Sequence, residues 1–339
     1  MLEKSELLAV SLNKQFVHEK SSRLGVVSAL CGLQAQFANY PRHALRMRAA
    51  DYDPATWNAG LVKTWTFRGT LHLVPKTELG LFLSAMGVPD KWDDNWNIGR
   101  RQKPRLSGLI MDWIRGGACE REELKSLCRG HGVKEKVLEN VFHGWGGLLK
   151  EMCQRGLIVY APGTKKHFLP CDGLEFYRRD AARATLLERY FHHLGPATME
   201  DCATFFGCTR KSLTELLRTH PLPLKSVTCE GVEYWYLGEW NPREIPSCLF
   251  LAGFDQLLLA YKDRSRLVDD KHRPDVVTNT GIIHPTVLVE GRLRAKWKLV
   301  GKTVAVTPFT RLGRARRKLV ADTAMRTFAG EADDVSFPD

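Results

Sequence analysis

Two glutamines separated by one residue are the most unusual polar feature of the sequence. Gln34 and Gln36 lie in the otherwise apolar run LCGLQAQF, shortly before Asn39-Tyr40-Pro41. A side-chain amide is no general base, but its oxygen accepts a hydrogen bond from water while its NH₂ group donates one. Two amides that converge could therefore hold a water molecule against a reacting carbon. Such placement alone can supply up to about 7–11 kcal/mol of a barrier in favourable systems.

The local pattern predicts that this pair lies at the end of a helix. Apolar residues follow helical spacing over 5–17 and again over 22–36. On a regular helix, residues two apart point about 200° away from each other, so both amides can face one substrate only where the helix ends or unwinds. Pro41 supports an end here, because the residue before proline is pushed out of the helical region. The alternative is that one glutamine is a surface residue and the other a satisfied buried amide.

The segment Arg68-Gly69-Thr70-Leu71-His72 is a second candidate for chemistry. If it is extended, Arg68, Thr70 and His72 share one face and could line the site or hold a phosphate. Gly69 would allow a close approach of the backbone. The alternative is an edge strand whose polar residues are solvated, with His72 a plain structural histidine.

Two further groups are candidates for DNA contacts, and for each the alternative is a solvated surface. They are Arg42, Arg46 and Arg48 after the proline, and Tyr261, Asp263 and Arg264 in a basic, turn-rich loop. In the loop, Asp263 could brace an arginine. The tryptophans at 65, 145, 235 and 297 lie in apolar settings and are expected in the core rather than as base-stacking platforms.

Composition points to a polyanionic partner. The 339 residues carry a net charge of +12, which suits nucleic acid first and an acidic membrane surface second. The nine cysteines form no Cys-x-x-Cys pair, which indicates reduced thiols in a cytosolic protein. The charged N-terminal segment is not a signal peptide, and no stretch has the ~18 apolar residues of a membrane span. Metal-ligand spacings, Walker loops and G-x-G-x-x-G are absent from the sequence, so we expect no metal and no cofactor.

The elements that must position these residues occur in three similar passes, each with helices followed by a hairpin. Residues 1–100 combine the two helices above, short helices over 43–50 and 54–62, and a hairpin around Gly69. Residues 101–175 contain helices over 105–117, 120–132 and 135–156, then two strands with Lys165 and Lys166 at their tip. Residues 176–245 contain helices over 183–196, 198–207 and 209–220, then a hairpin around Glu230-Gly231. The pattern predicts three tandem winged helix-turn-helix units.

Residues 246–339 differ, since they are β-branched, alternating and rich in turns. They predict a small antiparallel, barrel-like unit, closed by a basic helix from Thr310 and a frayed acidic tail over 331–339. The expected fold class is therefore α+β, with four units.

This chain resembles the AlkZ-like winged-helix DNA glycosylases over roughly residues 5–330. The motifs that carry the resemblance, in the family's order, are LQAQ, WTFRGTLHLVP, LGPATMEDCATFFG, FDQLLLAYKDR and VLVEGRLRAKW. Members excise N-alkylated purines from DNA, and some unhook interstrand crosslinks. Gln34-Ala35-Gln36 is similar to the catalytic motif of the Gln-x-Gln branch, which implies that both glutamines are catalytic. The RGTLH and Tyr-x-Asp-Arg segments fit the family, so the predicted DNA-binding residues are Arg68, Thr70, His72, Tyr261, Asp263 and Arg264, with Arg42 added as the phosphate candidate after the proline.

No lysine lies within the glutamine motif, which indicates a monofunctional hydrolytic enzyme without Schiff-base chemistry, and no cofactor is expected. Its partner would be double-stranded DNA that contains alkylated purines or crosslinks, with no membrane involved. We expect a monomer in the cytoplasm, associated with the nucleoid. Because an N7- or N3-alkylated purine already carries a positive charge, a neutral amide pair that only places water would suffice for its release.

The alternative from a different class is a non-enzymatic winged-helix transcriptional regulator. Such a protein would need a basic recognition helix and usually a dimer interface, yet only residues 209–220 suit the first role and no heptad helix is visible. A protein-interaction scaffold would leave the charge of +12 without a use.

Overall fold

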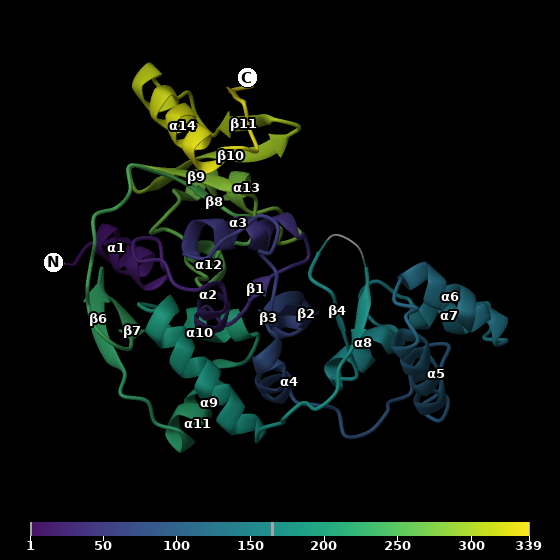
Figure 1. The fold of residues 1–339 in the computed structure, drawn as a ribbon. Helices are drawn as coiled ribbons and strands as arrows, with labels where there is room; N and C mark the ends of the chain where they lie inside the picture. Colours follow the sequence, from purple (N-terminus) through teal and green to yellow (C-terminus); the bar gives the residue numbers. More distant parts are fainter. Residues whose placement is uncertain (1, 164–165, 339) are drawn as a thin grey trace. The chain divides into compact units, whose positions relative to one another are not determined.

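The computed structural model describes residues 2–163 and 166–338, and contacts divide the chain into two compact units. Unit 1 contains residues 1–30, 39–57 and 188–339, and unit 2 contains residues 31–38 and 58–187. Each combines helices with antiparallel strands, so the predicted α+β class is confirmed (Figure 1). The division of the sequence into four units, three of them winged helices, stays a prediction. None of the helices in the described part of the chain is long and apolar enough to cross a membrane.

Unit 2 is built on a five-stranded sheet in the order β1-β3-β2-β4-β5. The strands are β1 (Leu33–Gln34), β2 (Leu61–Trp65), β3 (Leu71–Pro75), β4 (Ile158–Tyr160) and β5 (Phe168–Pro170). The predicted hairpin around Gly69 is confirmed as β2 and β3. The two strands predicted within 157–170 are also confirmed, and β4 joins β2 through the pair Lys63–Tyr160. The predicted tip residue Lys165 lies outside the described residues.

The helices α5 (Lys103–Arg115), α6 (Arg121–Gly130), α7 (Glu135–Val141) and α8 (Gly147–Gln154) enclose an apolar core against this sheet. The unit also contains α4 (Leu79–Met86), most of α9 (Arg179–Arg189) and the short turns η1 (Phe67–Gly69) and η2 (Lys76–Glu78).

Two predicted helices of this unit are wrong. Residues 135–156 form two helices and not one, because Gly147 has a left-handed φ of 79° and a Cβ there would lie 1.7 Å from the carbonyl oxygen of Asn140. Residues 54–62 form turns that lead into β2, so the helix expected there does not exist.

Unit 1 contains a second five-stranded sheet, in the order β12-β11-β10-β9-β8. Its strands are β8 (Cys248–Leu251), β9 (Thr286–Val289), β10 (Arg292–Val300), β11 (Thr303–Pro308) and β12 (Asp334–Ser336). Because β8 and β12 are edges, the described strands form an open sheet rather than the predicted barrel-like unit. The tail expected to be frayed is also different, since β12 pairs in parallel with β11.

The remaining elements of unit 1 match the predictions only in part, because short helices also occur at 256–259 and 273–276, in segments expected to be β-rich. The helices are α1 (Lys4–Lys14), α2 (Arg23–Ala29), α3 (Asn39–Arg48), α10 (Met199–Phe206), α11 (Arg210–Thr219), α12 (Gln256–Leu259), α13 (Arg273–Val276) and α14 (Arg314–Thr327), with η3 (Tyr190–Leu194) and η4 (Asp270–His272). The hairpin around Glu230-Gly231 is confirmed as β6 (Lys225–Cys229) and β7 (Val232–Tyr236). Pro41 does not end a helix but lies in the first turn of α3, where proline is tolerated.

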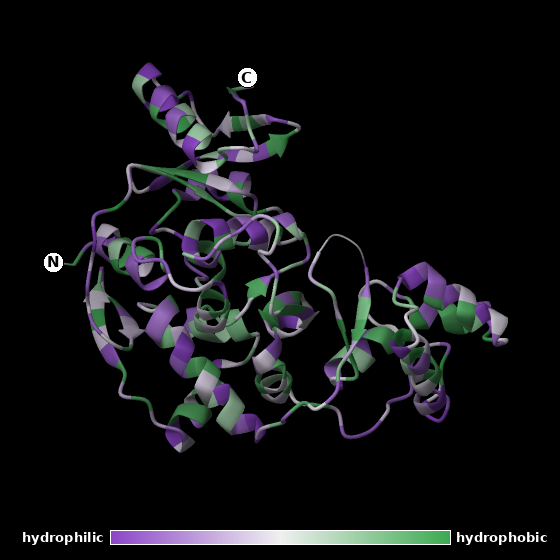
Figure 2. Cartoon of the chain, viewed as in Figure 1, coloured by the Kyte–Doolittle hydropathy of each residue, from purple (hydrophilic) through white to green (hydrophobic). Residues whose placement is uncertain are grey.

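Side chains of the sheet in unit 1 alternate between two apolar cores. Along β8, the side chain of Phe250 packs in the core that includes Val320 of α14 and Phe328, which directly follows α14. The next side chain, Leu251, packs with residues of α1 and α12. The outer side of α14 is mainly hydrophilic (Figure 2). The sheet is therefore covered on both faces, by α14 on one and by α1 and α12 on the other.

Candidate active site

The Gln-x-Gln segment leaves α2 through a sharp turn and not as a helix end. Ser22 caps the start of α2 by accepting a hydrogen bond from the amide of Gly25, but the helix stops at Ala29. Cys31 and Gly32 then take left-handed φ values of 56° and 83°. A Cβ on Gly32 would lie 3.1 Å from the carbonyl oxygen of Leu73, so a glycine allows the close approach of β1 to β3. The predicted helix over 22–36 is therefore wrong in its second half.

Extended backbone brings the two glutamines together. Gln34 lies opposite His72 in the β1–β3 pair, and the amide of Ala35 donates to the carbonyl oxygen of Leu71 at 2.8 Å. Residues two apart on extended chain share a face, so the amides converge without any helix end. Nε2 of Gln34 donates to Oε1 of Gln36 at 2.6 Å. Gln34 is buried and Gln36 is half-buried, so the pair reaches solvent through Gln36.

Arg68 fixes the orientation of these amides. It lies with Gly69 in the turn between β2 and β3, where both residues have left-handed φ values, 55° and 63°. This is the geometry of a type I′ turn, and a non-glycine residue there carries strain of about 1–3 kcal/mol. Nη2 of Arg68 donates to Oε1 of Gln34 at 3.2 Å. Because a guanidinium has only donors, it must meet the amide oxygen of Gln34, which leaves the NH₂ group to face Gln36.

His72 continues the chain of hydrogen bonds as a neutral ring. Burial, and then the charge of Arg68, lower the pKa of His72 to about 3. Its Nε2 lies 3.4 Å from Nη2 of Arg68 and must accept, so Nδ1 carries the proton and points to the carbonyl oxygen of Thr70 at 3.3 Å. Burial also lowers the pKa of Arg68 to about 10, so the guanidinium stays charged at neutral pH. Thr70 donates to the carbonyl oxygen of Phe67 and holds the turn.

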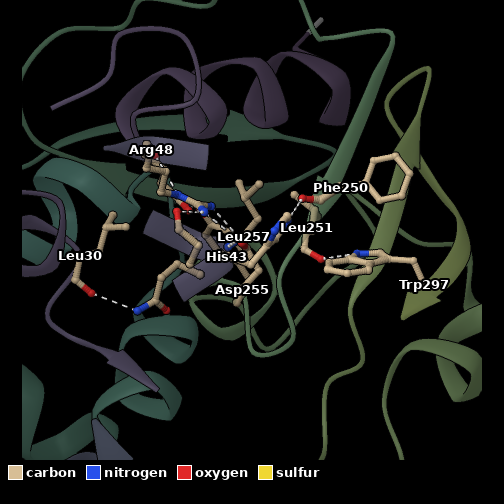
Figure 3. Close-up of polar contacts among 12 residues, drawn as sticks. Leu30, His43, Arg48, Phe250, Leu251, Asp255, Leu257 and Trp297 are labelled. Atoms are coloured by element: carbon tan, nitrogen blue, oxygen red, sulfur yellow. Dashed lines mark hydrogen bonds and ion pairs between the residues drawn. The ribbon is translucent and has the colours of Figure 1, made fainter. Parts of the chain in front are cut away.

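The arginines after Pro41 lie in unit 1 and have different environments. Arg42 is partly exposed and donates to Oε1 of Glu331 at 2.8 Å. Arg48 is fully buried, and its Nη1 and Nη2 donate to the two oxygens of Asp255 at 3.0 and 2.7 Å (Figure 3). The interpretation of Arg48 as a phosphate ligand is therefore wrong, because its charge is already neutralised inside the protein.

The predicted Tyr-x-Asp-Arg contacts also lie in unit 1. Tyr261 is buried, and its hydroxyl lies 2.9 Å from the carbonyl oxygen of Leu194, which favours a structural role. Asp263 accepts hydrogen bonds from the amide and hydroxyl of Ser265 rather than from an arginine. Nε of Arg264 donates to a backbone carbonyl oxygen at 2.9 Å. Of the predicted site residues, the structure thus brings Gln34, Gln36, Arg68, Thr70 and His72 together in unit 2. The DNA-binding roles stay predictions.

Comparison with known proteins decides the class of this protein. A family model described as DNA glycosylase AlkZ-like matches residues 27–329. The chain belongs to the AlkZ-like DNA glycosylase family. This glycosylase is 29% identical, over 334 aligned residues and 90% of each chain, to a Streptomyces sahachiroi protein named interstrand DNA cross-link repair glycosylase. Its structure is similar to that of the Streptomyces sahachiroi DNA glycosylase AlkZ, with a TM-score of 0.80, 26% identity, and coverage of 99% of this chain and 100% of that one. The resemblance drawn from the motifs is confirmed, and an enzyme is favoured over a regulator.

Two residues of the glycosylase were missed as site candidates from sequence. Lys150 of α8 places its Nζ 4.0 Å from the position a Cβ would take on Gly69, next to the Arg68 turn. Trp145 is 63% exposed, although it was expected in the core, and its carbonyl oxygen accepts from Lys150. The available signal was the run His-Gly-Trp-Gly-Gly, because glycines around a large aromatic residue indicate a loop rather than a core helix.

Proposed function

We propose that this glycosylase hydrolyses the N-glycosidic bond of N7- or N3-alkylated purines in duplex DNA, with a water molecule positioned by Gln34 and Gln36. The contact between the two amides, oriented by Arg68, carries the proposal. The name of the Streptomyces relative supports a role in interstrand crosslink repair, so we include the unhooking of crosslinks among its reactions. We further propose that it acts as a monomer on nucleoid DNA.

The chemistry needs little from the protein beyond placement. An alkylated purine is cationic and leaves as a neutral base when its bond to C1′ breaks, so no general acid is required. The water oxygen forms the new bond to C1′ and its proton passes to solvent. Oε1 of Gln36 accepts one hydrogen bond from Gln34 and has a second lone pair that can accept from this water. Because neutral amides cannot protonate a base, unmodified purines would stay intact.

Base release from duplex DNA carrying N7-methylguanine, with a crosslinked duplex in parallel, tests this function. Gln34→Ala and Gln36→Ala should each lower the single-turnover rate by about 10²-fold or more, since a lost catalytic hydrogen bond costs about 2.7–4 kcal/mol. Duplex affinity should hardly change, because the amides carry no charge. Gln102→Ala, which truncates an exposed amide of unit 2, is the matched control and should retain the parent rate. Glutamine variants that are folded and excise at the parent rate would refute the mechanism.

Metal dependence offers a second check of the mechanism. In residues 2–163 and 166–338, no group of three or more His, Cys, Asp or Glu side chains is placed to hold a metal ion. A cationic leaving group and an amide-held water also need no Lewis acid. We therefore expect full base release in EDTA, and a loss that zinc or magnesium restores would contradict the proposed route.

A further inference from the structure

Unit 1 contains a basic cavity that the glutamine mechanism does not use. Its volume is about 560 Å³, within the range of ligand-binding pockets. Its charged lining consists of four permanent cations and one carboxylate, besides two histidines: Arg42, Arg46, Lys296, Lys298 and Glu331. Neither Lys296 nor Lys298 forms an ion pair with any residue that the structure describes. The cavity is therefore suited to an anionic group.

One wall of the cavity is rigid and uncharged. His43 donates from Nε2 to the carbonyl oxygen of Phe250 at 2.8 Å, and Nε1 of Trp297 donates to that of Leu251 at 2.8 Å (Figure 3). The ring of His43 also stacks on Phe328, with centroids 5.2 Å apart. Burial lowers the pKa of His43 to about 4, so the ring is neutral at neutral pH. The positive charge of the cavity thus comes from arginine and lysine.

The carboxylate of Glu331 accepts hydrogen bonds from both arginines, as a phosphate group could. Its Oε1 accepts from Nη2 of Arg42 at 2.8 Å and also from Nη2 of Arg46. Convergence of guanidinium groups on one anionic oxygen is a common way for proteins to hold phosphate. In addition, Nε of Arg42 is buried and finds no hydrogen-bond partner within the described chain. The arginine pair therefore retains donor capacity that the carboxylate does not use.

We propose that Arg42 and Arg46 bind a backbone phosphate of duplex DNA, and that Glu331 occupies this position when DNA is absent. The proposal rests on the proposed function, because it takes duplex DNA as the substrate. A phosphodiester carries the same single charge as the carboxylate that it replaces. Binding must therefore break both contacts of Glu331, and this competition lowers the affinity for DNA.

Removing the charge of Glu331 should strengthen binding. We expect Glu331→Gln to lower the dissociation constant for an undamaged duplex about two- to thirtyfold at low salt, the range for the two partly exposed ion pairs that DNA must otherwise break. Fluorescence anisotropy over a series of salt concentrations measures this. Because unfolding cannot tighten binding, the sign of the effect separates it from simple destabilisation.

A matched control separates local competition from general electrostatics. Asp333 lies two residues away and pairs with Lys302 at 2.9 Å, with both side chains exposed. Asp333→Asn removes the same charge without freeing the arginines, so it should change affinity less than twofold. Equal effects of Glu331→Gln and Asp333→Asn would overturn the proposal.

The arginine side of the site gives an independent test. Arg42→Gln should weaken duplex binding and lower the slope of log K against log salt by about one, the loss of one phosphate contact. In the Arg42→Gln background, Glu331→Gln should retain at most half of its effect in log units. An undiminished effect would overturn the proposal.

Binding measurements with small phosphates show whether the anion comes from duplex DNA or from a free phosphate compound. Inorganic phosphate and deoxyguanosine monophosphate should bind only weakly by calorimetry. Tight binding of the mononucleotide, together with duplex affinity that ignores Glu331→Gln, would overturn the assignment to DNA. Base release by the parent protein is scored separately. If the parent protein releases no base but Glu331→Gln and Asp333→Asn differ in duplex affinity as expected, only the proposed function is refuted. If it releases the base normally but the two variants have equal affinity, only the phosphate site is refuted.

Discussion

Arg68→Asn should separate the catalytic arrangement from the stability of the hairpin. Asparagine is favoured before glycine in a type I′ turn and tolerates the left-handed φ of 55° that Arg68 adopts. The turn should therefore stay formed, and its strain should fall. The shorter side chain cannot reach Gln34, however, so the amide oxygen loses its charged donor.

The size of the effect follows from the lost contact. A hydrogen bond to a charged group contributes about 1.5–3 kcal/mol. The distance of 3.2 Å between Nη2 and Oε1 places this one at the lower end. We expect a fall of about tenfold in the single-turnover rate of N7-methylguanine release, with the melting temperature unchanged or raised.

A double-mutant cycle shows whether Arg68 acts through Gln34. In a Gln34→Ala background the oxygen that Arg68 orients is gone, so adding Arg68→Asn should cost almost nothing further. Coupling of at least 1 kcal/mol is expected between the two changes. Additive losses would refute the reasoning. So would a rate loss that disappears when the enzyme is raised to a concentration that saturates the DNA, because weaker duplex binding would then explain it.

Three further outcomes follow from the structure. Arg48→Met should lower the free energy of unfolding by about 3–5 kcal/mol in urea titrations, because it leaves the buried carboxylate of Asp255 unpaired; adding Asp255→Leu should restore part of the loss. The native pKa values of His43 and His72, about 4 and about 3, lie below that of an unfolded histidine. At pH values below about 6.5, the unfolded chain therefore binds protons that the native rings do not, and the free energy of unfolding should fall by about 1.4 kcal/mol per pH unit for each ring. A urea midpoint that stays constant from pH 7 to 5 would contradict their burial. Gln36→Asp should keep partial activity that rises with pH through the pKa of the new carboxylate, and loss at every pH would count against water placement.

Sequence patterning predicted the regular elements well where the chain is amphipathic. The helices α10 and α11 and the hairpin of β6 and β7 follow from apolar spacing and turn residues. Prediction failed where backbone conformation depends on tertiary contacts. The left-handed turn at Cys31 follows from the approach of Gly32 to β3, about 40 residues away in sequence, which no local pattern reports.

The candidate site was predicted in its residues but not in its geometry. The types and spacing of Gln34 and Gln36 suggested converging amides, yet a strand rather than a helix end brings them together. The role of Arg68 as an orienting donor could not be foreseen, because an arginine is seldom found at a left-handed turn position. The burial of Tyr261 could not be predicted either, because the sequence of a polar loop does not indicate whether its aromatic residue is buried.

The order of segments along the chain has a consequence for how the protein is made. Unit 2 takes β1 from residues 31–38, whereas its other strands come from residues 58–187. During synthesis, unit 2 can be completed once residue 187 has left the ribosome, but unit 1 must wait for residues 188–339. A fragment of residues 58–187 would lack β1 and expose the edge of β3 (Leu71–Pro75), a strand edge prone to aggregation. The glutamine segment is thus also a protective edge strand, and a soluble fragment of unit 2 should begin before Cys31.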